Sequence, residues 1–139
     1  PVGSVLCGSQ AMISRARRLR KQLGGGMRQA GILAAAGIYA LESMTGRLVE
    51  DHRRALQLAE GLAALPAVTF EMGFPTTNMV FPSFSTDVPF TAADLARRLN
   101  DQGVRVGVVA ERRLRMVTHY WIDDAAVEQT LQAFRDILA

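Results

Sequence analysis

The sequence predicts an α/β protein whose C-terminal part is a small α+β domain, with a mainly antiparallel sheet covered by helices. Two observations lead to this fold class. From Pro66 onward, short β-prone runs and helical runs alternate in the order β-β-α-β-β-α, which is typical of a two-layer sandwich. Before that point the chain is mainly helical and apolar, and 139 residues with 49% hydrophobic content allow one ordinary core.

The first expected elements are a strand and a basic helix. Val2 to Cys7 is predicted to be a strand, in which Cys7 is a small buried hydrophobe. Ser9 is the expected N-cap of a helix that ends at Gly24. The apolar stripe of this helix consists of Met12, Ala16, Leu19 and Leu23, and basic side chains cover the rest of its surface.

A second, almost wholly apolar helix is expected from Met27 to about Met44, and its small side chains suit a buried central position. Its most apolar part, Ala30 to Leu41, is shorter than the roughly 20 residues that a membrane span needs, so no membrane association is expected. One strand and two helices cannot cover their own apolar surface. Residues 1–46 are therefore expected to be the C-terminal remnant of a larger domain, and residues 47–139 a separate small domain.

The small domain is expected to begin with an amphipathic helix from Arg47 to Leu65. Its apolar side is predicted to carry Leu48, His52, Ala55, Leu56, Ala59 and Leu62, with His52 as a core or interface residue. Strands are expected at Val68–Met72, Asn78–Phe81, Val104–Val109 and Arg113–His119. Thr91 is expected to cap the helix between the strand pairs, with Asp94 in its first turn. A terminal helix is expected to start at Asp123 or Asp124, with Val127, Leu131, Phe134 and Leu138 facing inward.

The single cysteine and the absence of recognisable site spacings limit the possible chemistry. One cysteine cannot form an internal disulfide, which indicates a reducing compartment and hence the cytoplasm. No cluster of Asp, Glu, His and Cys has the spacing of metal ligands, and no serine or cysteine triad can be assembled. No metal is therefore expected.

Three consecutive glycines, Gly24 to Gly26, follow a strongly basic segment. The stretch SRARRLRKQLGGGMR carries six positive side chains and no acidic one, in a chain of net charge +3. A glycine backbone can approach a ligand closely, and a helix that starts at Met27 would direct free N–H groups to the same place. With Lys21 and Arg28 nearby, this arrangement favours an anion such as phosphate. A flexible turn between two helices is the alternative, and three glycines alone favour the turn.

The segment RRLRMVTHYWID places another cation in an unusual position. Strand alternation puts Arg113, Arg115, Val117 and His119 on one face and Leu114, Met116 and Thr118 on the other. An arginine near the middle of an apolar strand needs a partner, and its planar guanidinium matches a carboxylate in two parallel hydrogen bonds. An internal ion pair with Asp or Glu, or a solvated sheet face, is the alternative for Arg115. His119, at the strand end, is expected to be a hydrogen-bonded structural residue.

Four segments, PVGSVLCG, RRLRKQLGGGMRQAGILAAAGIYAL, TNMVF and RMVTH, together resemble the C-terminal part of the low-specificity L-threonine aldolases. The resemblance covers essentially the whole chain, and GGGMRQAG and the RxVTH strand are its most specific parts. It implies a fold type I enzyme that uses pyridoxal 5'-phosphate (PLP) to cleave threonine or allo-threonine to glycine and an aldehyde. It also implies that residues 1–46 come from the large cofactor-binding domain.

The same resemblance implies roles for individual residues. Arg28 is similar to an arginine that reaches the cofactor phosphate across a subunit interface, and Lys21 to a residue that lines that site, with Gly25 and Gly26 in the same loop. Arg115 is similar to the arginine that binds the α-carboxylate of the amino-acid substrate. The lysine that binds the cofactor covalently is expected upstream of Pro1. The isolated chain is therefore predicted to be inactive and to need the N-terminal part of the same enzyme, in a homodimer or homotetramer with shared active sites.

Two other functions stay open on the residues alone. The small domain of another fold type I enzyme, such as an aminotransferase, would also use Arg115 for a carboxylate, but its product would be a keto acid. An arginine-rich nucleic-acid-binding module is the second alternative. The basic helix has no interleaved aromatic residues, and the one tryptophan, Trp121, lies in another segment, so no nucleic acid is expected as a partner.

Overall fold

The computed structural model describes residues 4–138, so the predictions for Val2 and Gly3 lie outside the described residues. The chain divides into two units, Pro1–Gly46 and Arg47–Ala139. This division falls at the residue where the sequence places a domain boundary. That the first unit belongs to a larger cofactor-binding domain stays a prediction.

The first unit begins with an extended segment and the basic helix. Helix α1 (Gln10–Gln22) starts after Ser9, whose Oγ accepts a hydrogen bond from Met12 N at 3.3 Å, as predicted. The strand predicted up to Cys7 is not formed over residues 4–7, because no other strand of this unit offers backbone groups to pair with. Cys7 is exposed and not buried, for the same reason.

Helix α2 (Gly31–Tyr39) begins at Gly31 and not at Met27, and it continues into a π-helical turn, η1 (Ala40–Met44), and a 3₁₀ turn, η2 (Thr45–Arg47). The predicted burial of this helix is not what the structure shows. No residue from 4 to 46 is buried, and Ile32 is 81% exposed. The unit contains too few elements to cover its apolar side chains.

The continuous helical run Gly31–Ala63 has the length and apolarity of a membrane-spanning helix, with a mean hydropathy of 1.2 in its most apolar window, none of which is buried. The core helix of a soluble protein has the same length and composition, so these two properties do not separate the two cases. The absence of membrane association stays a prediction.

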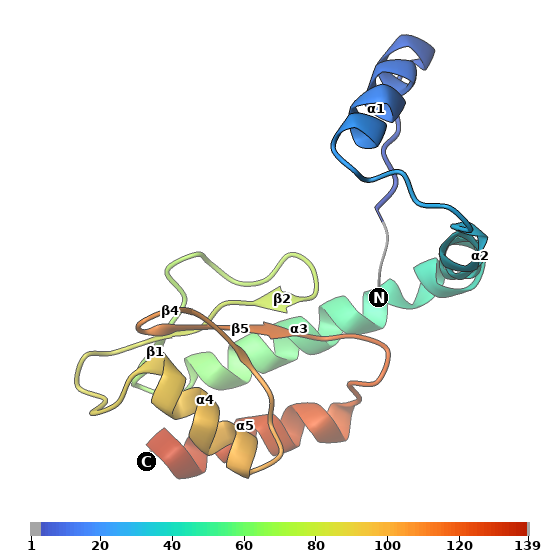
Figure 1. The fold of residues 1–139 in the computed structure, drawn as a ribbon. Coiled ribbons are helices and arrows are strands. Elements are labelled where there is room, and N and C mark those ends of the chain that lie inside the picture. Colours follow the sequence, from blue (N-terminus) through green and yellow to red (C-terminus); the bar gives the residue numbers. More distant parts are fainter. Residues whose placement is uncertain (1–3, 139) are drawn as a thin grey trace. The chain divides into compact units, whose positions relative to one another are not determined.

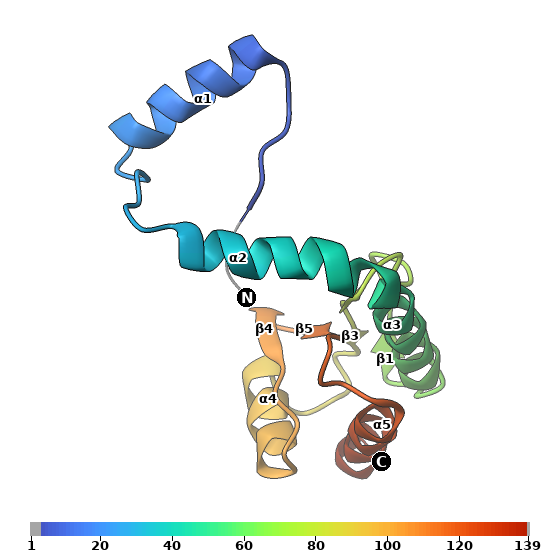
Figure 2. The same cartoon turned by 90° about the vertical axis from the view of Figure 1, so that its right-hand side faces the viewer.

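The second unit is an antiparallel five-stranded sheet with helices on one face. The strands are β1 (Val68–Thr69), β2 (Met79–Val80), β3 (Ser83–Phe84), β4 (Gly107–Ala110) and β5 (Arg113–Val117). They pair in the order β1-β3-β5-β2, and β4 pairs with the other edge of β5. The helices are α3 (Leu48–Ala63), α4 (Ala92–Asp101) and α5 (Asp124–Leu138). Both views show α4 and α5 on the same side of the sheet (Figure 1, Figure 2).

The predicted order of elements is confirmed, with one strand added. Ser83–Phe84, which the sequence places in a loop, forms β3 between β1 and β5. The segment is too short to show a strand period, so only its partners reveal it. The other strands are shorter than predicted. Thr91 caps α4 as expected, because its Oγ1 accepts from Asp94 N at 3.3 Å while Asp94 Oδ2 accepts from Thr91 N at 3.1 Å.

The core lies between the sheet and the helices. Its largest fully buried side chains include Phe134, Leu62, Leu95, Leu99 and Leu114. On α5, the predicted inward residues Val127, Leu131 and Phe134 are buried, and Leu138 is partly buried. The sheet therefore has one apolar face under helices, as the strand alternation predicts.

Helix α3 turns a different side inward than predicted. Ala55, Ala59 and Leu62 are buried as expected, but Leu48, His52 and Leu56 are exposed, and Asp51 and Leu58 take their place. The inner side of α3 is set by its packing on α5 and β2. Asp51 can face inward because Arg47 binds both oxygens of its carboxylate, at 2.6 and 2.9 Å. His52 is thus a surface residue and not a core residue.

Candidate carboxylate-binding and phosphate-binding residues

Strand β5 is the central strand of the second unit, with β2 and β3 along one edge and β4 along the other. Its side chains alternate as predicted, since Leu114 and Met116 are buried and Arg115 and Val117 are exposed. We call the face that carries Arg115 the open face of the sheet, because α4 and α5 both lie on the other side (Figure 2).

Arg115 differs from the two arginines that precede it on the same hairpin. Arg113 pairs with the Glu71 carboxylate and donates to Ser83 Oγ at 3.0 Å. The Arg112 guanidinium donates to several backbone carbonyls, including that of Val88 at 2.8 Å. Arg115 is exposed and has no ion pair with any residue from 4 to 138. The internal ion pair considered for Arg115 is therefore not formed. The Arg115 guanidinium is free to donate hydrogen bonds to an external carboxylate or to water.

The end of β5 is fixed by Thr118, which is 1% exposed. Its Oγ1 donates to the backbone oxygen of Asp51 at 2.7 Å, and its N donates to the backbone oxygen of Asn78 at 3.0 Å. The Asn78 side-chain amide donates in return to the Thr118 oxygen at 2.8 Å. These bonds hold the end of β5 against the first turn of α3.

The first turn of α3 is itself held by the Arg47–Asp51 ion pair. The hydrogen bond to Asp51 raises the pKa of Arg47, so this guanidinium stays charged. The guanidinium carbon of Arg47, Cζ, lies 5.1 Å from the centre of the ring of Tyr120, a residue that follows β5. The register of the strand that carries Arg115 therefore depends on contacts to two other segments.

His119 lies in the turn after β5. It is exposed, and its Nδ1 accepts a hydrogen bond from Trp121 N at 3.3 Å. Its backbone oxygen accepts from Ile122 N at 2.8 Å, and its ring meets the Trp121 ring edge-on at 6.0 Å between centroids. These are the contacts of a hydrogen-bonded turn residue, as predicted.

In the first unit, Lys21 lies across the glycine turn. A Cβ added at Gly26 would stand 2.8 Å from Lys21 Cδ and 3.2 Å from its Nζ, so a side chain at position 26 would displace the Lys21 side chain from this position. Gly24 has a φ of 79°, and Gly25 N donates to the Arg20 oxygen at 2.8 Å. The structure thus brings Lys21, Gly25 and Gly26 together at the end of α1.

Arg28 lies in the connection between α1 and α2 and is exposed. Because α2 begins at Gly31, the N–H groups of its first turn do not start at the glycines, and that part of the predicted anion site is wrong. No Asp or Glu occurs before Glu42, so Lys21 and Arg28 have no acidic neighbour in the sequence. An anion here would be held by these two side chains and the loop backbone.

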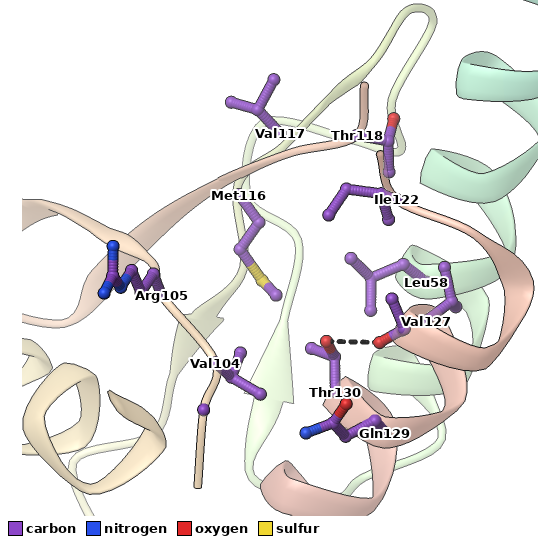
Figure 3. Close-up of a pocket in the computed structure, with 12 residues that line it drawn as sticks. Leu58, Val104, Arg105, Met116, Val117, Thr118, Ile122, Val127, Gln129 and Thr130 are labelled. Carbon is purple, nitrogen blue, oxygen red and sulfur yellow. Dashed lines mark hydrogen bonds between the residues drawn. The ribbon is translucent and has the colours of Figure 1, made fainter. Parts of the chain in front are cut away.

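A cavity of about 130 Å³ lies on the helix side of β5 (Figure 3). Its walls are part apolar and part polar, and include Leu58, Met116, Gln129 and Thr130. The hydroxyl of Thr130 in its wall donates to the Ala126 oxygen at 2.8 Å. The cavity and the Arg115 side chain lie on opposite faces of β5, so the cavity is separate from the candidate carboxylate site. Among residues 4–138, no group of three His, Cys, Asp or Glu side chains could hold a metal.

The second unit is thus a two-layer α+β domain that presents an exposed arginine, Arg115, on its open face. The fold of this chain is similar to that of solved structures of the cystine C-S lyase C-DES. A complex of C-DES with its product cysteine persulfide has a TM-score of 0.64 and 21% identity over 79% of this chain and 29% of that chain. A C-DES mutant with glycine linked covalently to the PLP cofactor has a TM-score of 0.63 and 22% identity over 78% of this chain and 28% of that chain.

A family model described as beta-eliminating lyase matches residues 1–85, and the chain belongs to this family. The chain is also similar to low-specificity L-threonine aldolases. It is 42% identical to the probable low-specificity L-threonine aldolase 2 of Arabidopsis thaliana, over 99% of this chain and 39% of that protein. It is 40% identical to the low specificity L-threonine aldolase of Escherichia coli (strain K12), over 100% of this chain and 39% of that protein. The predicted resemblance is confirmed, and the chain spans 39% of the length of these relatives.

Proposed function

We propose that this chain is part of a PLP-dependent lyase that cleaves L-threonine, L-allo-threonine and similar β-hydroxy-α-amino acids to glycine and an aldehyde. The observation that carries the proposal is Arg115, an exposed arginine of a central strand without an acidic partner among residues 4–138. The names of the relatives support a lyase over an aminotransferase and over a nucleic-acid-binding module.

In this proposal Arg115 binds the α-carboxylate of the amino acid through two parallel hydrogen bonds. A carboxylate held at two points cannot rotate freely, so the bond between Cα and Cβ is presented in one orientation. Thr118, Asn78 and Asp51 support this function by fixing the end of β5.

The residues of the first unit fit the phosphate group of the cofactor. Lys21 and Arg28 supply two positive charges without an acidic neighbour, and Gly26 leaves the space that the Lys21 side chain occupies. We assign the phosphate to Lys21, Arg28 and the backbone of Gly25 and Gly26. When bound, PLP supplies the electron sink that stabilises the carbanion left by cleavage.

The exposed apolar surface of the first unit supports association with further protein. Ile32 and Leu41 are 81% and 66% exposed, and large apolar side chains exposed in such number favour a contact with further protein. We propose that the N-terminal part of the enzyme covers it, in a homodimer or homotetramer. The exposed thiol of Cys7 supports a reducing compartment such as the cytoplasm.

The test of the carboxylate site is Arg115→Met in the complete enzyme, by which we mean the polypeptide with both this chain and its proposed N-terminal part. Loss of a bidentate, charge-assisted contact is expected to raise the KM for L-threonine by about 100-fold. Arg113→Met is the matched control, because Arg113 lies on the same strand and face but already has Glu71 as its partner. An unchanged KM in Arg115→Met would contradict the proposal.

Products distinguish the reaction types. The complete enzyme with L-threonine is expected to release glycine and acetaldehyde in equal amounts, whereas formation of a keto acid would support the aminotransferase. The 139-residue chain alone, supplied with PLP, is expected to release neither product.

A further inference from the structure

The neighbours of Arg115 across the sheet follow from the strand registers. On one side β2 and β3 share a single register with β5, since Val80 pairs with Met116 and Ser83 with Arg113. Continuing that register between the two pairs puts Phe81 opposite Arg115. The hydrogen bond from Leu114 N to the Pro82 oxygen, at 3.0 Å, agrees with it.

On the other side Gly107 of β4 is the direct partner of Arg115. Directly paired residues on one face of an antiparallel sheet have their Cβ positions about 5 Å apart, so they are immediate neighbours on that face. Arg115 therefore stands between an aromatic ring and a position without a side chain. We call Phe81, Arg115 and Gly107 the cross-strand row.

Backbone conformation does not account for glycine at 107. Gly107 is not among the described glycines with positive φ, which are Gly24, Gly73 and Gly103. A Cβ at Gly107 would meet Arg115 O at 3.4 Å and both Arg115 Cβ and Arg115 Nε at 3.7 Å, which are ordinary contacts. Gly107 is the first residue of β4, and glycine loses more conformational freedom on folding than any other residue, so a gain elsewhere is expected to offset its presence.

We propose that the cross-strand row is a one-sided carboxylate receptor, in which Gly107 keeps open the side of Arg115 from which the carboxylate binds. This inference rests on the proposed function of Arg115. A side chain at 107 would occupy the space beside Nε, one of the nitrogens that donate to a bidentate carboxylate. Phe81 occupies the paired position on the opposite side, so only the Gly107 side lacks a side chain. Gly107 is a positioning residue, since it acts through Arg115.

The experiment compares Gly107→Ala and Gly107→Val in the complete enzyme. KM for L-threonine is expected to rise about tenfold in Gly107→Ala, as for one weakened charge-assisted hydrogen bond, and further in Gly107→Val. The Kd of glycine, measured by calorimetry, is expected to rise in parallel, while kcat stays within about twofold because the lost contact is made equally before and during reaction. The melting temperature of Gly107→Ala is expected not to fall.

The matched control is Ala110→Val, which enlarges the residue opposite Arg113 on the same strand. It is expected to leave KM and the Kd of glycine unchanged. If Arg115→Met weakens glycine binding but Gly107→Ala and Gly107→Val do not, the one-sided receptor is wrong and the proposed function stands. If Arg115→Met itself has no effect, the proposed function fails. Should Gly107→Val unfold, the Gly107→Ala result decides alone.

Discussion

At the scale of single residues, Thr118 shows how a short polar side chain can fix a functional strand. Its Oγ1 and both backbone polar groups are bonded to residues of two other segments, Asp51 and Asn78. A buried hydroxyl that loses its partner costs more than the bond itself contributes, because the partner is left without a hydrogen bond. The burial of Thr118 follows from strand alternation, but its partners do not.

We predict that Thr118→Val lowers the free energy of unfolding by about 1–2 kcal/mol, since the isosteric side chain keeps the packing and removes one buried hydrogen bond. The control is Thr130→Val, because the Thr130 hydroxyl donates only to the Ala126 oxygen within the same helix. Thr130→Val is expected to lower the free energy of unfolding by less than half as much as Thr118→Val. Urea unfolding of both variants measures the difference, and equal losses would contradict the prediction.

At the scale of elements, α3 and α5 are joined by one carboxylate. Asp124, at the start of α5, accepts from Arg53 at 2.5 Å and from Arg54 at 2.9 Å. The hydrogen bond from Arg54, followed by that from Arg53, lowers the pKa of Asp124 below its ordinary value of 3.8. The same negative charge lies at the N-terminal end of α5, where the helix dipole favours it.

The lowered pKa of Asp124 predicts a loss of stability in acid. As the pH falls, the unfolded chain takes up the proton first, near pH 3.8, so the contribution of Asp124 is complete above that pH and is lost as the pH falls through the lower folded-state pKa. Asp124→Asn is therefore expected to be less stable at neutral pH and to lose stability less steeply below about pH 4. Thermal melts from pH 7 to pH 2 measure this, and parallel curves for the variant and the parent would refute it.

At the scale of the whole molecule, the two units differ in how much apolar surface they bury. The described core residues all lie between Ala55 and Phe134, within the second unit, whereas no residue from 4 to 46 is buried. Burial of apolar surface is the main favourable term in folding, so the two units are expected to have very different stabilities.

We predict that residues 47–139 fold without the first unit. The fragment is expected to melt cooperatively at the temperature of the 139-residue chain, because all core contacts are retained. In hydrogen exchange on the chain, amides around Ile32 are expected to exchange much faster than those around Leu114. A fragment that fails to melt cooperatively would show that the first unit contributes to the core.

Much of the fold follows from local patterns of the sequence. Ser9 and Thr91 cap helices where polar side chains precede helical runs, and the alternation of Leu114, Arg115 and Met116 is visible in the chain itself. Lys21 and Arg28 can be predicted from the sequence because they lie beside three glycines without a nearby acid, and Arg115 because it interrupts an apolar strand. Their binding roles stay predictions. Gly107 and Phe81 were missed, since neither shows a chemical signal without its cross-strand neighbour.

The sequence by itself determined the order of most elements, the faces of β5 and the membership of the beta-eliminating lyase family, because each depends on residues close together in the chain or on their identity. Only the tertiary structure decided the two-residue strand β3, the inner side of α3 and the pairing of Gly107 with Arg115. These depend on contacts between segments far apart in the chain. Such contacts are set by how the apolar faces of α3, α5 and the sheet fit together, and no local period encodes that fit.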